Sequence, residues 1–289
     1  MKMLFAALVA LALSAQPALG QTSISASVAN TQPESMAVGP DGSVYLGSQL
    51  DARIYRARPG QAVADPFIDM RPSAFVLGVL ADGGSNTLWV CELMSMDRSS
   101  PLLKGTSALR GFDLSTGAPK VRIPLPDATN LCNDFVVGPD KALYVADTSN
   151  ARILRVRPGA TEFEVVIQNA ALYGVDGLTF LGDVFYVNTV WAGNLYRIPM
   201  DAAGKASAPV QIHAPRVLRS PDGMRALNGK IYLAESANGT VSAITVANDV
   251  ATFTTVRSGL MGPCAVEPHG NVLWVVERPA HRATAIPLQ

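Results

Sequence analysis

Apolar and polar positions alternate in short runs along most of the chain, and residues 133–155 show this pattern most clearly. An apolar run (135–137) leads into a Gly-Pro-Asp turn, and two alternating runs (142–146 and 152–155) follow, separated by a polar corner. Such runs, joined by Gly, Pro and Asp, are typical of antiparallel β-strands. We therefore expect three consecutive strands of one sheet here, completed by a fourth run over 163–167.

The same pattern recurs along the chain at intervals of 41 to 56 residues. Every repeat but the last offers four strand-like runs, and helical patterns are nearly absent. Four strands in a repeat of about 40–50 residues are the signature of a β-propeller, in which each blade is one twisted four-stranded sheet. The chain is therefore predicted to be an all-β, six-bladed β-propeller whose blades begin at positions 34, 77, 133, 176, 222 and 263.

The last repeat lacks a fourth strand, and an alternating run over residues 22–28 precedes the first repeat. We expect this N-terminal strand to pair with the last blade and close the ring, because closure removes two exposed sheet edges. Residues 93–105 form the one long insertion, predicted as an irregular loop over the face where the first strands begin. This loop is either a wall or lid of a pocket, or a surface loop without function.

The first twenty residues differ from the rest. One Lys precedes the apolar run 4–14, and Ala18-Leu19-Gly20 has the small-x-small pattern of a signal-peptide cleavage site. This pattern predicts a secretory signal peptide over residues 1–20, because the apolar run is about half the ~20 residues that a membrane span needs. Residues 21–289 are then a single exported domain, periplasmic or secreted, without a membrane anchor after cleavage.

The formal net charge of zero and the dispersed Lys and Arg argue against a nucleic-acid partner, which requires a basic surface. We expect a monomer that binds a small molecule. The three cysteines, Cys91, Cys132 and Cys264, match no zinc-binding spacing, and each lies in or beside an apolar run. Buried, inert thiols are the favoured interpretation, and a Cys91–Cys132 disulfide is the alternative.

One position, which we call the slot, opens the first strand of every repeat. First strands line the central channel of a propeller, so the slot side chains should converge at one end of that channel. Carboxylates brought close together repel one another, and no Lys or Arg occupies another slot to neutralise them. The slot residues in chain order are Glu34, Leu77, Asn133, Asp176, Asp222 and Pro263.

A divalent cation would neutralise this ring. Oxygen ligands from carboxylates and an amide suit Ca²⁺ best, with Mg²⁺ or Mn²⁺ as alternatives, whereas Zn²⁺ usually recruits His or Cys. The three histidines lie outside the slots, so no Ser-His-Asp triad is expected. Taken singly, each acidic residue could instead cap a strand or accept backbone hydrogen bonds at a turn.

Several short motifs resemble the gluconolactonase, senescence marker protein (regucalcin) and luciferin-regenerating enzyme family, over nearly all of the predicted domain. The motifs are Glu34-Ser35, Asn133-Asp134, Asp176-Gly177-Leu178 and Ser220-Pro221-Asp222-Gly223-Met224. The resemblance implies a six-bladed propeller with one divalent cation, and for many members hydrolysis of lactones or related esters. It implies that Glu34, Asp176 and Asp222 are metal ligands, that Asp222 is also the general base, and that Asn133 binds the substrate.

Three positions depart from the family. The family often has Asn where Asp176 stands, and its sugar-lactone enzymes have an Arg where Leu131 stands. Met36-Ala37-Val38 is similar to the looser NHL-repeat propellers. A substrate more apolar than a sugar lactone is therefore consistent with the sequence.

Two functions remain open from the sequence. The first is a metal-dependent hydrolase of lactones or related esters. The second is a non-catalytic propeller that binds a small molecule, glycan or peptide, since the same blades serve both classes. A third, strictosidine-synthase-like or paraoxonase-like activity, is less well supported, because no His in the slots supports paraoxonase chemistry.

Overall fold

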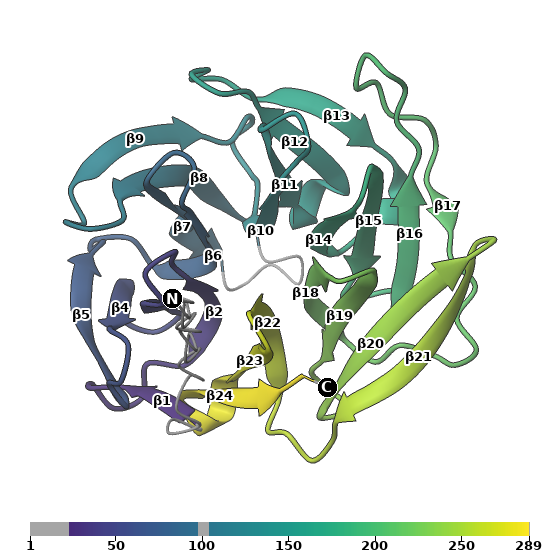
Figure 1. Ribbon diagram of the computed structural model, residues 1–289. Helices are drawn as coiled ribbons and strands as arrows, with labels where there is room; N and C mark the ends of the chain where they lie inside the picture. The colour runs from purple at the N-terminus through teal and green to yellow at the C-terminus, as the bar shows by residue number, and fades with distance from the viewer. Residues whose placement is uncertain (1–22, 98–103, 289) are drawn as a thin grey trace, which may run out of the picture.

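The computed structural model describes residues 23–97 and 104–288, and most of them lie in antiparallel strands. The predicted all-β class is confirmed. Sheets are arranged as a ring around a common axis, with the first strand of each sheet innermost (Figure 1). Three single-turn 3-10 helices interrupt the strands: η1 (Thr148–Asn150), η2 (Ala170–Leu172) and η3 (Arg278–Ala280). Within the described ranges, no helix has the length and apolar character that crossing a membrane requires.

Four of the sheets have four strands each, ordered from the axis outward as they occur in the chain. The first comprises β6 (Phe75–Asp82), β7 (Thr87–Asp97), β8 (Lys104–Asp113) and β9 (Pro119–Pro124). The second comprises β10 (Cys132–Val137), β11 (Leu143–Asp147), β12 (Arg152–Val156) and β13 (Glu164–Gln168). The third comprises β14 (Val175–Leu181), β15 (Val184–Thr189), β16 (Asn194–Ile198) and β17 (Val210–Gln211). The fourth comprises β18 (Pro221–Leu227), β19 (Lys230–Glu235), β20 (Thr240–Ala247) and β21 (Val250–Arg257).

The remaining strands form one sheet of eight, in which the two ends of the described chain meet. Its one half holds β2 (Pro33–Val38), β3 (Val44–Ser48), β4 (Arg53–Ala57) and β5 (Val63–Asp69). Its other half holds β22 (Pro263–His269), β23 (Val272–Glu277), β24 (Arg282–Pro287) and β1 (Ser23–Ala26). Strand β1 pairs antiparallel with β24 and parallel with β5, so it joins the two halves.

Each innermost strand carries a β-bulge near its start, which follows the first paired residue in five strands and the second, Val76, in β6. In β18, for example, Pro221 pairs with Glu235, but the next pair is Met224 with Leu233. A bulge leaves its residues out of the hydrogen-bond ladder and redirects their side chains. The residues directly after the last pair before each bulge are Glu34, Leu77, Asn133, Asp176, Asp222 and Cys264.

Five of these six residues are the predicted slots, and the sixth corrects the sequence alignment by one position. Pro263 pairs with Glu277 in the ladder, as Pro221 pairs with Glu235, so the slot of the last inner strand is Cys264. The error arose because the last repeat has no acidic or amide residue to mark the slot. A Pro also stands directly before the slot in β2 and β18, and aligning these Pro residues would have placed the last slot at Cys264.

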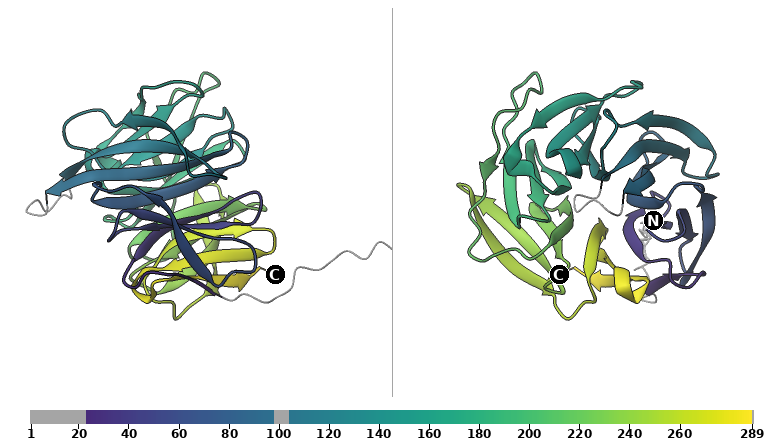
Figure 2. Two further views of the ribbon diagram at one scale, coloured as in Figure 1. Left: turned by 90° about the vertical axis from the view of Figure 1, so that its left-hand side faces the viewer. Right: turned by 180° about the vertical axis from the view of Figure 1, so that it is seen from behind.

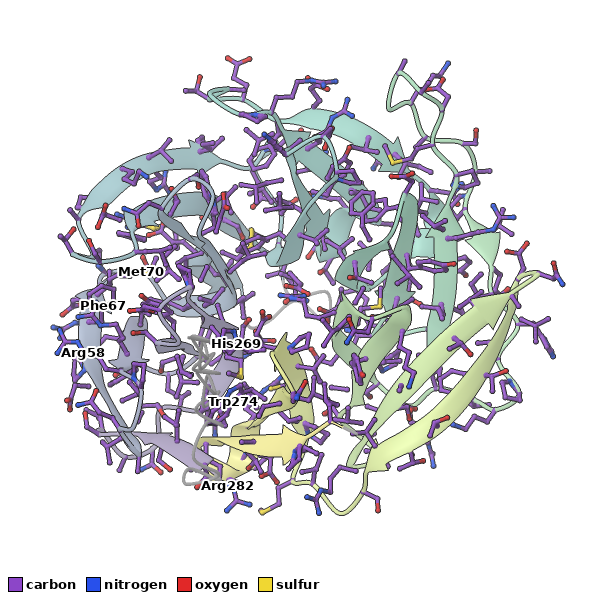
Figure 3. All side chains as sticks on the ribbon, in the orientation of Figure 1. Arg58, Phe67, Met70, His269, Trp274 and Arg282 are labelled. Atoms are coloured by element: carbon purple, nitrogen blue, oxygen red, sulfur yellow. A yellow bond between two sulfur atoms is a disulfide. The ribbon has the colours of Figure 1, made fainter. Side chains whose placement is uncertain are left out.

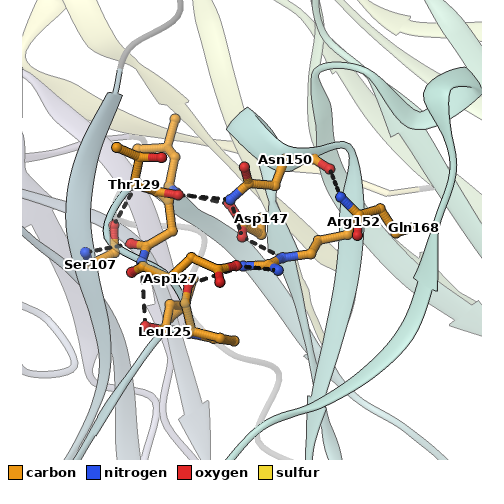
Figure 4. A network of polar contacts seen from close by, with 11 residues as sticks. Ser107, Leu125, Asp127, Thr129, Asp147, Asn150, Arg152 and Gln168 are labelled. Atoms are coloured by element: carbon orange, nitrogen blue, oxygen red, sulfur yellow. Dashed lines mark hydrogen bonds and ion pairs between the residues drawn. The ribbon is translucent and has the colours of Figure 1, made fainter.

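In four sheets, the second-strand residue that pairs just before the bulge is a buried carboxylate: Glu92, Asp147, Glu235 and Glu277. Asp147 shows the function of this residue. The Asp147 carboxylate accepts hydrogen bonds from the Leu131 backbone N–H at 2.9 Å and from Arg152 Nε at 2.7 Å. Arg152 in turn contacts Asp127 at 2.7 Å, in the loop before β10 (Figure 4). This network ties the loop that enters the inner strand to the second and third strands.

We expect Asp147→Asn to destabilise the protein by about 3 kcal/mol, because the substitution leaves the buried guanidinium of Arg152 with the exposed Asp127 as its one remaining charged partner among the described residues. Urea denaturation would measure this loss. A matched Asp127→Asn variant should cost less than about 1 kcal/mol, since that carboxylate is 62% exposed. Equal losses for the two variants would contradict this account.

Apolar side chains fill the spaces between neighbouring sheets (Figure 3). Residues on one side of a strand pack against the preceding sheet and those on the other side against the following sheet. Trp89 and Cys91 therefore face β10–β13, while Leu88 and Val90 face the sheet of β2–β5. Aromatic residues take part in this packing, as Phe67 in β5 and Trp274 in β23 illustrate (Figure 3).

The cysteines correct the favoured prediction of three free thiols. Cys91 and Cys132 form a disulfide that links β7 to the start of β10, and only Cys264 is a free, buried thiol. The two bonded residues are 41 positions apart and belong to different sheets, so their contact depends on sheet-to-sheet packing. The alternative that the sequence left open is the one that the structure shows.

The insertion at residues 93–105 also differs from the prediction. Its two ends continue β7 and β8 as paired strands, with Asp97 opposite Lys104, instead of forming an irregular loop. Figure 2 shows this pair of strands reaching past the ends of the neighbouring sheets. Residues 98–103 of the predicted loop lie outside the described ranges, so its role as a pocket wall or lid stays a prediction.

Candidate functional site

The four candidate site residues meet at one end of the channel, as the sequence predicted. Glu34, Asn133, Asp176 and Asp222 line one pocket of about 330 Å³. The same four residues border a second cavity of about 10 Å³ deeper in the channel, which has room for about one water or one ion. The three carboxylate residues are between 4% and 7% exposed.

Glycine in the bulges allows the inner strands to approach one another closely. A Cβ atom at Gly177 would lie 2.5 Å from the Asp222 carbonyl oxygen, and one at Gly78 would lie 2.4 Å from the Asn133 carbonyl oxygen. Any side chain at these two positions would push neighbouring strands apart. The glycines therefore hold the slot residues of neighbouring strands within one site.

A basic residue that the slot pattern did not reveal lies among the carboxylates. Arg278, in η3 directly after β23, places its Nη2 atom 3.3 Å from Asp222 Oδ2 and 3.5 Å from Glu34 Oε1. It partly neutralises a ring that the sequence left without a counter-charge. The residue directly after the second strand forms a second register of pocket residues: Gln49, Thr148, Val190 and Arg278 all line the pocket. Aligning that position between repeats would have revealed Arg278.

The far side of the small cavity is crossed by a second buried ion network. Arg225 in β18 binds both carboxylate oxygens of Asp134 in β10, at 2.7 and 3.0 Å, and lies 3.3 Å from Glu267 in β22. All three residues project from innermost strands. This bridge spans the channel below the slot ring, so the pocket opens at the other face.

Negative charge exceeds positive charge in this part of the channel, where five carboxylates face two guanidinium groups. Burial, with a further contribution from the charge of Asp134, raises the pKa of Glu34 to about 7 although Arg278 opposes the shift. Burial and the neighbouring charges of Asp222 and Glu34 hold the pKa of Asp176 well above its usual range. Burial and Glu34 likewise raise the pKa of Asp222. The site therefore favours either protons or an additional cation.

The donor set fits a divalent cation in its chemistry. Carboxylate and amide oxygens are the ligands that Ca²⁺ prefers, and the excess of buried negative charge would be offset by it. The present arrangement is not yet that of a closed metal shell: within residues 23–97 and 104–288, no three His, Cys, Asp or Glu side chains are grouped as a metal-binding set. Arg278 contacts two of the three candidate ligands, so it would have to move for a cation to bind there.

We expect the stability of the chelator-treated protein to fall as the pH rises from about 4.5 to 7. The reason is that the raised pKa of Glu34 makes the folded state bind more protons than the unfolded state in this range. The loss is about 3 kcal/mol for Glu34, and Asp176 and Asp222 act in the same direction. Thermal melts across this range should show the decline, and Glu34→Gln should flatten it. A melting temperature that rises with pH in the chelated wild type would contradict the expectation.

The wall of the pocket is mainly apolar. Phe75, Leu77, Leu131, Val190 and Trp191 line it together with the polar groups already described. Leu131 stands at the position where the sugar-lactone enzymes of the resembled family have an Arg. The Asp147 carboxylate holds its backbone by accepting a hydrogen bond from the Leu131 N–H. The pocket thus combines a charged floor with an apolar side.

Solved structures show what this fold is similar to. The PQQ-bound aldose sugar dehydrogenase of Streptomyces coelicolor shares 16% identity, with a TM-score of 0.64 over 92% of this chain and 96% of that one. A luciferin-regenerating enzyme shares 15% identity, with a TM-score of 0.64 over 86% of this chain and 84% of that one. An inactive virginiamycin B lyase of Staphylococcus aureus with quinupristin shares 13% identity, with a TM-score of 0.62 over 92% and 98% of the two chains.

No protein-family model matches the chain, and no curated protein matches it in sequence. Likeness at 13–16% identity carries information on the fold alone, because β-propellers serve many unrelated chemistries. The sheets around a common axis, the bulged inner strands and these structural neighbours together assign the chain to the β-propeller fold.

Proposed function

We propose that this protein is an exported hydrolase of lactones or related esters that depends on one divalent cation, with Ca²⁺ preferred over Mg²⁺, Mn²⁺ or Zn²⁺. The observation that carries the proposal is the cluster of Glu34, Asp176 and Asp222 with Asn133 at the floor of one pocket. The specific likeness to the gluconolactonase and luciferin-regenerating enzyme family, with six blades closed by β1, belongs to the same proposal. The pairing of β1 with β24 supports it.

The chain's own residues suit the steps of ester hydrolysis. The bound cation would polarise the substrate carbonyl and make a water molecule easier to deprotonate. Asp222 would take the proton from that water, since its pKa is raised towards the range useful for a general base. The Asn133 amide would donate a hydrogen bond to the substrate. Glu34, Asp176 and Asp222 would hold the cation by their carboxylate oxygens.

The proposal is tested by purifying the protein, removing metal with a chelator, and assaying a panel of alkyl lactones, sugar lactones and aryl esters with and without Ca²⁺. We expect hydrolysis to disappear on chelation and to return with the cation, at about one bound ion for each chain. Hydrolysis that persists in the chelated protein without bound metal would refute the metal dependence.

A second function, a non-catalytic propeller that binds a small molecule, glycan or peptide, is favoured by one observation. Arg278 already pairs with Glu34 and Asp222, so the protein's own guanidinium neutralises these carboxylates, and they need not hold a catalytic cation. Tight binding of the cation without turnover of any lactone or ester in the same panel would support this function over the hydrolase.

A further inference from the structure

We propose that the site takes a substrate with an extended apolar or aromatic arm, which lies against Trp191 while the ester or lactone group reaches the carboxylates. This inference rests on the proposed function for the reacting group, and it adds the class of substituent. The exposed fraction of the lining residues rises from 7% at Asp222 to 38% at Trp191. The charged groups therefore lie at depth and the indole at the mouth, which suits a ligand with a polar head and an apolar arm.

Trp191 is held in place although it is partly exposed. Its ring packs on Tyr173, with ring centroids 4.8 Å apart, and Tyr173 itself is 42% exposed. Gly174 lies beneath the indole at a φ of 77°, and a Cβ atom there would come within 2.9 Å of Trp191 Cε3. The Val190 N–H donates to the Gly174 carbonyl at 2.8 Å, which ties the two loops together. A fixed aromatic surface loses little conformational entropy when a ligand covers it.

The opposite side of the pocket is apolar as well. Leu131 and Leu77 are 3% and 6% exposed, so their side chains form wall rather than surface. Leu50, which is 51% exposed, directly follows the lining residue Gln49. Gln49 is a partly exposed, uncharged polar residue of the lining, whereas the Thr148 hydroxyl is buried and donates to the Val175 carbonyl at 2.6 Å. Among the described residues, few groups near the mouth could therefore hydrogen-bond the hydroxyls of a sugar ring.

The size of the pocket limits the arm. A volume of about 330 Å³ lies at the lower end of small-molecule sites, so a lactone ring with a medium-length alkyl or phenyl substituent would fill it. Each methylene buried against the apolar wall should raise kcat/KM about threefold to fourfold, until the pocket is full.

The test is a series of γ-lactones with methyl, butyl, hexyl, octyl and phenyl substituents, with gluconolactone as the polar comparison. We expect kcat/KM to rise with chain length in the wild type. Trp191→Ala should lower the octyl-to-methyl ratio of kcat/KM by about tenfold, mainly through KM, and Trp191→Phe should retain most of the ratio. Val217→Ala is the control, because Val217 is 78% exposed and is not among the residues that line this pocket.

A second measurement does not require turnover. Trp89 lines another pocket of about 520 Å³, so the change in tryptophan fluorescence on adding an octyl lactam is compared between the wild type and Trp191→Phe. The part of the change that the variant loses reports on Trp191. If the lactam binds through Trp191 but no lactone is hydrolysed, the proposed hydrolase function is refuted, and the proposal of a ligand with an apolar arm is supported. If lactones are hydrolysed with a kcat/KM that does not depend on chain length, or if Trp191→Ala leaves the octyl-to-methyl ratio of kcat/KM unchanged, the proposal of an apolar arm is refuted. The proposed hydrolase function is then unaffected.

Discussion

Asp222→Asn should lower kcat for lactone hydrolysis by about 10²- to 10⁴-fold while the protein still binds its cation. The amide keeps an oxygen ligand at the same place but cannot accept the proton from water. The buried backbone contact to the Gly223 N–H, at 3.0 Å, can also be kept by the amide oxygen. Steady-state kinetics at saturating Ca²⁺, with metal content measured on the same sample, would separate the two effects.

The control for this variant is Asp183→Asn, which makes the same chemical change at an exposed turn outside the pocket. It should retain wild-type kcat. Full activity in Asp222→Asn with the cation bound would remove Asp222 from the role of general base, and the raised pKa of Asp222 would then reflect only its burial and the charges of its neighbours.

Arg278→Gln should destabilise the chelated protein and tighten its binding of Ca²⁺. Without the guanidinium, Glu34 and Asp222 lose a cationic partner that both contact, which should cost about 3 kcal/mol and lower Tm by about 6–12 °C. The same change removes a competing positive charge from the carboxylates. Repulsion between a guanidinium and a cation a few ångströms away is worth at least about 1.4 kcal/mol at the effective dielectric of a protein, so the Kd for Ca²⁺ should fall tenfold or more.

Thermal melts in chelator and calorimetric titration with Ca²⁺ would measure these two changes. Arg278→Lys is the matched control, because it keeps one positive charge in the loop after β23 and should show a smaller shift in both quantities. If Arg278→Gln binds Ca²⁺ more weakly than the wild type, then Arg278 supports the cation site instead of competing for it.

The sequence predicts the β-propeller well because its signals are local. Alternating runs of about five residues and turns rich in Gly, Pro and Asp recur at a regular interval, and each run forms the strand expected of it. Glu34, Asn133, Asp176 and Asp222 were found in the same way, since each opens an inner strand. One repeated position was therefore enough to place four residues in one pocket.

Two of the features that the sequence did not reveal depend on contacts between sheets, and a third depends on strand pairing within the last sheet. The Cys91–Cys132 disulfide joins two sheets that pack together. Arg278 belongs to a different repeat position from its partners and lies 56 residues from Asp222. The slot of the last inner strand needed the pairing of Pro263 with Glu277 to set its register.

The bulge in each inner strand lets the slot side chain vary without a change in the hydrogen bonds that hold the sheet together. Its residues stand outside the hydrogen-bond ladder, and the six positions accordingly hold glutamate, leucine, asparagine, two aspartates and cysteine within one repeated backbone. A new side chain at Leu77 would face the pocket without breaking a strand pair. Cys264 is 1% exposed and its Sγ lies 3.2 Å from the Glu34 carbonyl oxygen, so only a small side chain fits there. New reactivity can therefore evolve on this scaffold, or be engineered into it, one substitution at a time, with the framework tolerating the change.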